Sequence, residues 1–135
     1  MQYLTGVYWD VGEFRRQNQD SILLLQTLTG RGRIVLAAVC DGMGGLQFGE
    51  LASTGAVRCF EDWFDQQLPE LMRTDLTERN IFISWHKMLE QLHQKLCSYA
   101  QNNGMQLGTT VSTVLLTQDR LYLVQVGDSR VYLEN

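Results

Sequence analysis

The chain has 135 residues, 44% of them hydrophobic and 19% charged, which suits one globular domain and excludes a disordered chain. Its net charge is −4 and it has no basic cluster, so neither nucleic acid nor an anionic membrane surface is expected as a partner. The longest apolar run, residues 34–40, is far shorter than the ~20 residues of a membrane span.

The cysteine spacing and the N-terminal residues both indicate the compartment in which the protein resides. The three cysteines are widely spaced and contain no CxxC, which excludes a zinc ribbon or a disulfide scaffold and fits a reducing compartment. Acidic residues, rather than a basic region, follow Met1, so no secretory signal is expected. We therefore expect a cytoplasmic protein.

Three strands are predicted in the first third of the chain. Aromatic and β-branched residues predict a strand over residues 3–9, and a polar loop separates it from a second strand over residues 21–28. Residues 29–32 contain two glycines and predict a turn. Residues 33–40 are almost continuously apolar, typical of a buried strand, and the glycine-rich segment 41–45 is expected to end it.

Two helices are predicted in the middle. Apolar residues recur at helical spacing over residues 48–68, and Pro69 is expected to stop that helix. Thr77 is a candidate N-cap for a second helix, whose apolar stripe runs over residues 81–99. The segment 102–104, Asn-Asn-Gly, is expected to end it.

Strands are predicted again over residues 111–116, 121–126 and 130–133. The order is then three strands, two helices and three strands. Runs of strands around a helix pair indicate an α+β fold with mainly antiparallel sheet, not alternating βαβ units.

The two predicted hairpins suggest a register. A short loop centred near residues 30–31 places Asp20 opposite Asp41, and a loop centred on residues 118–119 places Asp128 opposite Thr109. Two carboxylates facing each other across strands repel unless a cation lies between them. The sequence therefore predicts that Asp20 and Asp41 lie together at one end of a sheet.

Each polar motif by itself has a plain alternative. Asp41-Gly42-Met43-Gly44-Gly45 fits a ligand-binding carboxylate or an ordinary tight turn, and it lacks the third glycine of a dinucleotide fingerprint. The loop 15–20 could hold a phosphate through arginine or be a solvated loop, and residues 127–130 could form a simple turn. His86 and His93 are expected to be ordinary residues of a helix face. The three cysteines are expected to be buried small apolar residues, and Trp63, Phe64 and Trp85 are expected in the core.

In combination the motifs are more specific. R-x-x-N-x-D at 15–20, D-G-M-G-G at 41–45, G-T-T at 108–110 and G-D-S-R at 127–130 follow one another in this order. This set resembles the bacterial branch of the metal-dependent type 2C (PPM) serine/threonine protein phosphatases, over residues 6–133. The resemblance implies part of a four-layer α-β-β-α sandwich with the C-terminal half missing. Residues 1–135 would be the N-terminal portion of a single phosphatase catalytic domain.

The resemblance also implies an activity and site residues. It implies hydrolysis of phosphoserine and phosphothreonine in a phosphoprotein by a metal-activated water at a binuclear Mg²⁺ or Mn²⁺ centre, with a third ion in some members. Arg15 and Asp41 would be the catalytic residues, and Arg15 would bind the substrate phosphate. The metal-binding residues would be Asp20, Asp41, Gly42 and Asp128, with Thr109 and Thr110 as a structural pair beside them.

Three departures from the family pattern qualify this expectation. Gln19 stands where many members have Glu, and Met43 stands where animal members have a histidine general acid. Two further metal-binding aspartates of the family follow the G-D-S-R motif and have no counterpart up to Asn135. We therefore expect this chain to be inactive alone and to form a homodimer or exchange strands. The alternative is a non-catalytic regulatory or binding module on the same fold.

Overall fold

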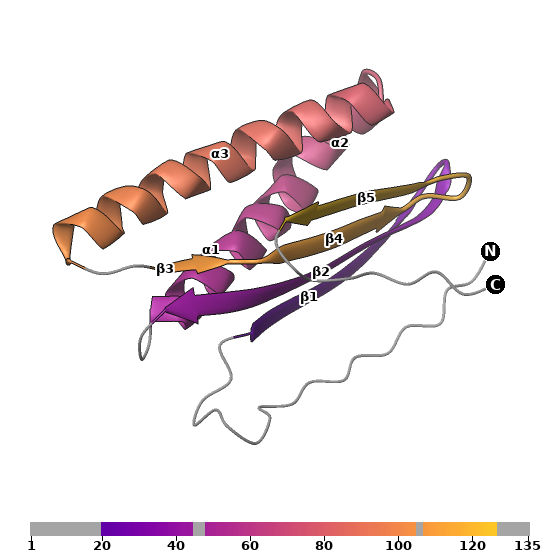
Figure 1. Ribbon diagram of the computed structural model, residues 1–135. Helices are drawn as coiled ribbons and strands as arrows, with labels where there is room; N and C mark the ends of the chain where they lie inside the picture. The colour runs from indigo at the N-terminus through magenta and orange to yellow at the C-terminus, as the bar shows by residue number, and fades with distance from the viewer. Residues whose placement is uncertain (1–19, 45–47, 105–106, 127–135) are drawn as a thin grey trace.

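An antiparallel sheet with helices packed against one of its faces makes up the described part of the chain (Figure 1). The computed structural model describes residues 20–44, 48–104 and 107–126. The strands expected over residues 3–9 and 130–133, and the site residues Arg15 and Asp128, lie outside these ranges. The elements, in chain order, are β1 (Asp20–Thr29), β2 (Gly32–Gly44), α1 (Phe48–Asp62), η1 (Trp63–Gln67, a π-helical turn), α2 (Leu68–Arg73), α3 (Glu78–Asn102), β3 (Leu107–Thr109), β4 (Val111–Leu116) and β5 (Leu121–Val126).

Both predicted hairpins have the expected register. In β1–β2 the partners run from Thr29 opposite Gly32 to Asp20 opposite Asp41. Gly32 closes the turn with a φ of 105°, a backbone conformation that residues other than glycine rarely adopt. In β4–β5 Val111 lies opposite Val126, so the predicted register is confirmed as far as the described residues reach.

The second strand is longer than predicted. Strand β2 does not end at Cys40 but continues through the glycine-rich segment to Gly44. Its last residues pair with β3, with Gly42 opposite Thr109 and Gly44 opposite Leu107. Because this partner comes from a distant part of the sequence, local composition could not reveal that the glycines remain in a sheet.

The helices differ from the prediction in one place. The stripe over residues 48–68 is divided into α1, η1 and α2, and Pro69 does not stop the helix. It lies in the first turn of α2, directly after the π turn η1, and the helix continues to Arg73. The start of α3 is as predicted: Thr77 is the N-cap, and its hydroxyl accepts a hydrogen bond of 3.1 Å from the Asn80 N–H.

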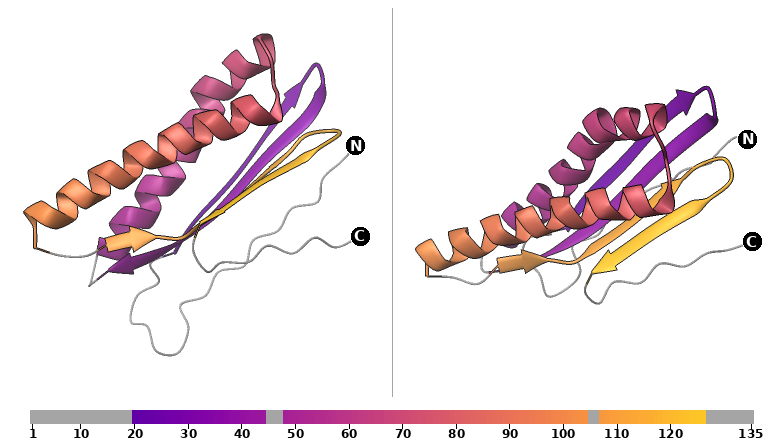
Figure 2. Two further views of the ribbon diagram at one scale, coloured as in Figure 1. Left: turned by 45° about the horizontal axis from the view of Figure 1, so that its top comes forward. Right: turned by 90° about the horizontal axis from the view of Figure 1, so that it is seen from above.

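The core lies between the sheet and the helices, which all cover the same face (Figure 2). Trp85 of α3 makes edge-to-face contacts with Phe60, Trp63 and Phe82, at centroid distances of 5.6, 5.3 and 5.9 Å. The Trp63 indole N–H donates to Ser84 Oγ at 2.8 Å. The expected core position of Trp63, Phe64 and Trp85 is confirmed.

The cysteines were expected to be buried, and this was wrong for one of them. Cys40 is buried and Cys59 is half-buried, whereas Cys97 is exposed on α3. His86 and His93 are exposed on the same helix, as expected. The residue type cysteine does not by itself tell whether the side chain is buried. The way α3 packs on the sheet leaves Cys97 exposed.

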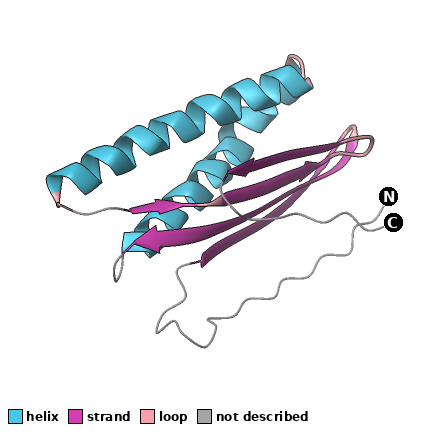
Figure 3. Ribbon diagram, viewed as in Figure 1, coloured by secondary structure: helices cyan, strands magenta, loops and turns pink. Residues whose placement is uncertain are grey.

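No helix among the described residues covers the opposite face of the sheet (Figure 3). Several apolar side chains on that face are exposed. Side chains alternate between the two faces of a strand, and Ala38 and Cys40 point toward the helices. Val39 therefore points the other way, as does Leu123, and they are 46% and 39% exposed. The described residues thus supply one sheet and one helical layer.

Candidate functional site

Two aspartates lie opposite each other at one end of the β1–β2 ladder. Asp20 and Asp41 are cross-strand partners, at the end of the hairpin away from its turn. Directly opposite residues have Cβ atoms about 4.5–5.5 Å apart. Ser21 bonds to helix α1 and Cys40 is in the core, so by alternation both aspartates belong to the sheet face that the helices leave uncovered.

The start of β1 is tied to α1 by hydroxyl groups. Ser21 Oγ lies 2.9 Å from Ser53 Oγ and 3.4 Å from Thr54 Oγ1. Ser53 is fully buried, and its hydroxyl also donates to the Glu50 carbonyl at 3.2 Å. These bonds fix the main chain directly after Asp20.

The main chain of Asp41 is fixed by two threonines. The Thr110 N–H donates to the Asp41 carbonyl at 2.9 Å, and the Asp41 N–H donates to Thr110 Oγ1 at 3.2 Å. The Thr109 hydroxyl donates to the Thr110 carbonyl at 2.8 Å and lies 3.3 Å from the Asp41 carbonyl. A side-chain oxygen thus takes the place of a ladder carbonyl at the break between β3 and β4. The expected structural pair, Thr109 and Thr110, does lie beside Asp41.

Gly42 follows directly and is buried, opposite Thr109 of β3. The structure therefore brings three of the predicted site residues together: Asp20, Asp41 and Gly42. Arg15 and Asp128 lie outside the described residues.

The donors at this edge are oxygen atoms, which suit hard cations such as Mg²⁺ and Mn²⁺. A divalent ion would also offset the repulsion between two facing carboxylates. Within residues 20–44, 48–104 and 107–126, no group of three or more His, Cys, Asp or Glu side chains could hold a metal ion. Asp20 and Asp41 therefore fit part of a metal site rather than a complete one.

The sequence did not reveal several of the supporting groups. Strand β3 is only three residues long, too short for a periodic signal. The roles of Ser21 and Ser53 depend on how α1 packs on β1 and leave no local pattern. The G-T-T motif was the one signal that pointed to Thr109 and Thr110.

A comparison with known families decides what this arrangement belongs to. Residues 15–135 match the family described as "Protein phosphatase 2C". The chain belongs to the protein phosphatase 2C family. The α+β class with antiparallel strands, predicted from the order of elements and from this resemblance, is confirmed by the structure and by solved structures of such phosphatases.

Similar proteins are bacterial serine/threonine phosphatases. The chain is 29% identical over 129 residues to the serine/threonine phosphatase stp of Listeria monocytogenes, covering 92% of this chain and 47% of that protein. The solved serine/threonine phosphatase of S. agalactiae is 30% identical with a TM-score of 0.66, over 90% of this chain and 47% of that one. The catalytic domain of the phosphatase PstP, solved with two manganese ions, is 27% identical with a TM-score of 0.63, over 90% and 46%. The chain thus spans about half the length of the protein phosphatase 2C relatives it matches.

None of the helices that the structure describes is both long and apolar enough to cross a membrane.

Proposed function

We propose that this chain is the N-terminal portion of a single metal-dependent phosphatase domain that hydrolyses phosphoserine and phosphothreonine in phosphoproteins. The observation that carries the proposal is the facing pair Asp20 and Asp41, with the Asp41 main chain held by Thr110. The pair occurs in a chain whose relatives are named serine/threonine phosphatases, one of them solved with two manganese ions.

Each residue has a proposed role. Asp41 and the Gly42 carbonyl bind metal, and Asp20 binds metal or its water ligands. Two bound Mg²⁺ or Mn²⁺ ions would activate water and neutralise charge on the phosphoryl oxygens. Arg15 binds the substrate phosphate, because a guanidinium matches two phosphate oxygens at once. Asp128 would hold a third ion.

The protein's own contribution at this edge is rigidity. The bonds of Thr110 to Asp41 and of Ser21 to α1 fix both aspartates from the main-chain side. Preorganised carboxylates do not have to be gathered when a cation binds, which saves conformational entropy.

We predict that the 135-residue chain by itself has no significant phosphatase activity. Two metal-binding aspartates that the family resemblance implies are not among its residues, so the carboxylates present cannot complete a binuclear centre. Hydrolysis of p-nitrophenyl phosphate with Mn²⁺ measures this. Turnover comparable to that of full-length relatives, abolished by Asp41→Ala, would contradict the prediction.

We also predict that Mn²⁺ stabilises the chain through the aspartate pair. A ligand that binds only the folded state adds about 2.7 kcal/mol at one hundred times its Kd. Thermal unfolding with increasing Mn²⁺ should show a rising Tm in the wild type and a much smaller rise in Asp20→Asn and Asp41→Asn. Asp119→Asn, in the exposed β4–β5 turn, is the matched control. An equal rise in all variants would show that the metal binds elsewhere.

The alternative, a non-catalytic module on the same fold, predicts a different result. A polypeptide of the relatives' full length containing this sequence would then bind Mn²⁺ but not hydrolyse p-nitrophenyl phosphate. Activity in that polypeptide, lost in Asp41→Ala, would exclude the alternative.

A further inference from the structure

The last turns of α3 carry a histidine and a cysteine that face each other. Cys97 Sγ lies 3.5 Å from His93 Nε2 and 3.9 Å from His93 Nδ1. Residues four apart in an α-helix are neighbours on one face. Both side chains are exposed, so the pair is open to solvent rather than sealed in the core.

The two side chains are close enough for both to bind one ion. A tetrahedral zinc with Zn–S of about 2.3 Å and Zn–N of about 2.05 Å places the two ligand atoms about 3.5–3.6 Å apart. His93 Nε2 and Cys97 Sγ already have this separation. Sγ lies nearly as close to Nδ1 as to Nε2, so the histidine side chain must rotate to direct the Nε2 lone pair at an ion bound by Sγ.

We propose that His93 and Cys97 form a second metal site, for Zn²⁺ or a similar divalent ion, on the exposed face of α3. Thiolate and imidazole favour such ions over Mg²⁺ and Mn²⁺. The site therefore differs in chemistry from the oxygen ligands at Asp20 and Asp41. When the ion binds, the Cys97 S–H bond breaks, its proton passes to solvent and a metal–sulfur bond forms.

Cys97 is the one cysteine of the three that suits this role. Burial, with a smaller contribution from the neighbouring Cys59 thiol, raises the pKa of Cys40 to about 12. Burial also raises the pKa of Cys59, although Lys95 opposes the effect. Both thiols are thereby kept protonated, and a protonated thiol is a poor metal ligand.

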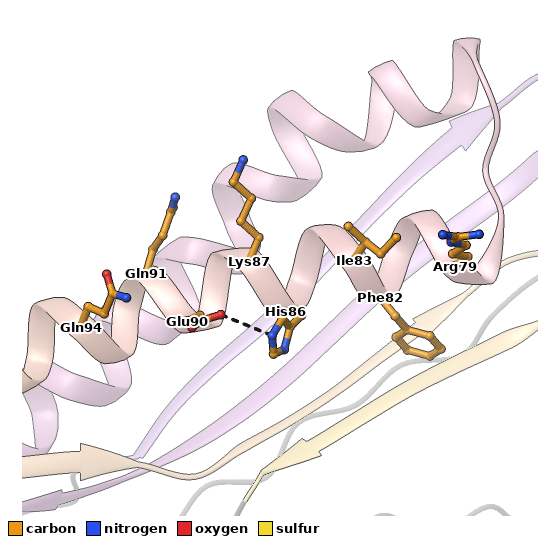
Figure 4. A pocket seen from close by; sticks show the side chains of 8 residues that line it. All are labelled: Arg79, Phe82, Ile83, His86, Lys87, Glu90, Gln91 and Gln94. Atoms are coloured by element: carbon orange, nitrogen blue, oxygen red, sulfur yellow. Dashed lines mark ion pairs between the residues drawn. The ribbon is translucent and has the colours of Figure 1, made fainter.

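The remaining coordination positions belong to water. Among the described side chains, no third His, Cys, Asp or Glu joins the pair in a metal-holding group. His86 and Glu90, on the same helix, pair with each other at 3.3 Å (Figure 4). The site is thus a two-residue chelate with open positions.

Cobalt is a direct probe, because Co²⁺ bound to a thiolate gives a charge-transfer absorption band that oxygen ligands do not. We would titrate the reduced 135-residue chain with Co²⁺ and then displace it with Zn²⁺. The wild type should develop the band at one ion per chain and lose it on addition of Zn²⁺. Cys97→Ser should abolish it.

The histidine variant tests the chelate itself. Loss of an outer partner of a metal ligand costs about 10–100-fold in affinity, and loss of a ligand costs at least as much. His93→Ala should therefore weaken the apparent affinity by at least about tenfold. His86→Ala, which removes an exposed histidine of the same helix, should leave it unchanged. Circular dichroism checks that each variant keeps its helices.

Three results would overturn the proposal: no thiolate band with excess Co²⁺, an unchanged affinity in His93→Ala, or the same loss in His86→Ala. The proposal does not depend on the phosphatase assignment. Asp41→Asn should keep the cobalt–thiolate band even where it loses stabilisation by Mn²⁺, so the two ideas fail separately.

Discussion

The side-chain hydroxyl of Thr110, rather than a backbone carbonyl, accepts the hydrogen bond from the Asp41 N–H. The Thr110 N–H in turn donates to the Asp41 carbonyl. Thr110 therefore bonds to both main-chain polar groups of Asp41. Thr110 is only 8% exposed, and water therefore competes poorly for these bonds. Thr110 thus fixes the position of the Asp41 main chain in the sheet, and with it the place from which the carboxylate projects.

Thr110→Val should lower the free energy of unfolding by about 1–3 kcal/mol, because the isosteric side chain removes the acceptor used by the part-buried Asp41 N–H. Urea denaturation measures the loss. Thr110→Ser keeps the hydroxyl and should recover much of the stability. A valine variant as stable as the wild type would show that this bond contributes little.

At the scale of elements, the helical layer combines one irregular helix with one regular one. The chain from Phe48 to Arg73 remains helical through a π turn at η1, where the Leu68 N–H donates to the Trp63 carbonyl. Trp63 and Phe64 of that turn are both buried. Both aromatic residues of the turn therefore contribute to the core between the helices and the sheet.

Helix α3 depends on a single capping side chain at its start. Thr77→Ala should lower the free energy of unfolding by about 1 kcal/mol, because the Asn80 N–H loses its acceptor. Chemical denaturation of Thr77→Ala and Thr77→Ser compares the two. If serine, which retains the hydroxyl, destabilised as much as alanine, the loss would come from methyl packing and not from the cap.

At the scale of the whole molecule, the described helices cover one face of the sheet and none of them covers the other. The helices bury the first, while the second carries half-exposed apolar side chains such as Val39, Leu121 and Leu123. Covering exposed apolar side chains such as these gains about 25 cal/mol per Å² of apolar surface removed from water.

We predict that the 135-residue chain associates with itself through this face. Light scattering across a concentration series should show dimers or larger species. Leu123→Glu should weaken association by placing a charge on the uncovered face. Ile83→Glu is the matched control, because Ile83 is 54% exposed but lies on α3. A strictly monomeric, well-folded wild type at high concentration would contradict the prediction.

The sequence by itself determined the features that depend on neighbouring residues or on residue type. The glycine turn at residues 29–32 set the β1–β2 register and hence the pairing of Asp20 with Asp41. The hydroxyl of Thr77 marks the start of α3, and the ordered motifs by themselves indicate the family. These features depend on residues close together in the chain or on residue identity alone.

Only the tertiary structure decided the rest. The continuation of β2 to Gly44 requires β3, which arrives after the whole helical layer, and the bonds of Thr110 to Asp41 exist only once these strands meet. The passage of the helix through Pro69 and the exposure of Cys97 depend on how each helix lies on the sheet. A contact between distant segments leaves no periodic pattern in the sequence of either segment. Local propensity leaves several conformations nearly equal in free energy, and tertiary packing selects one of them.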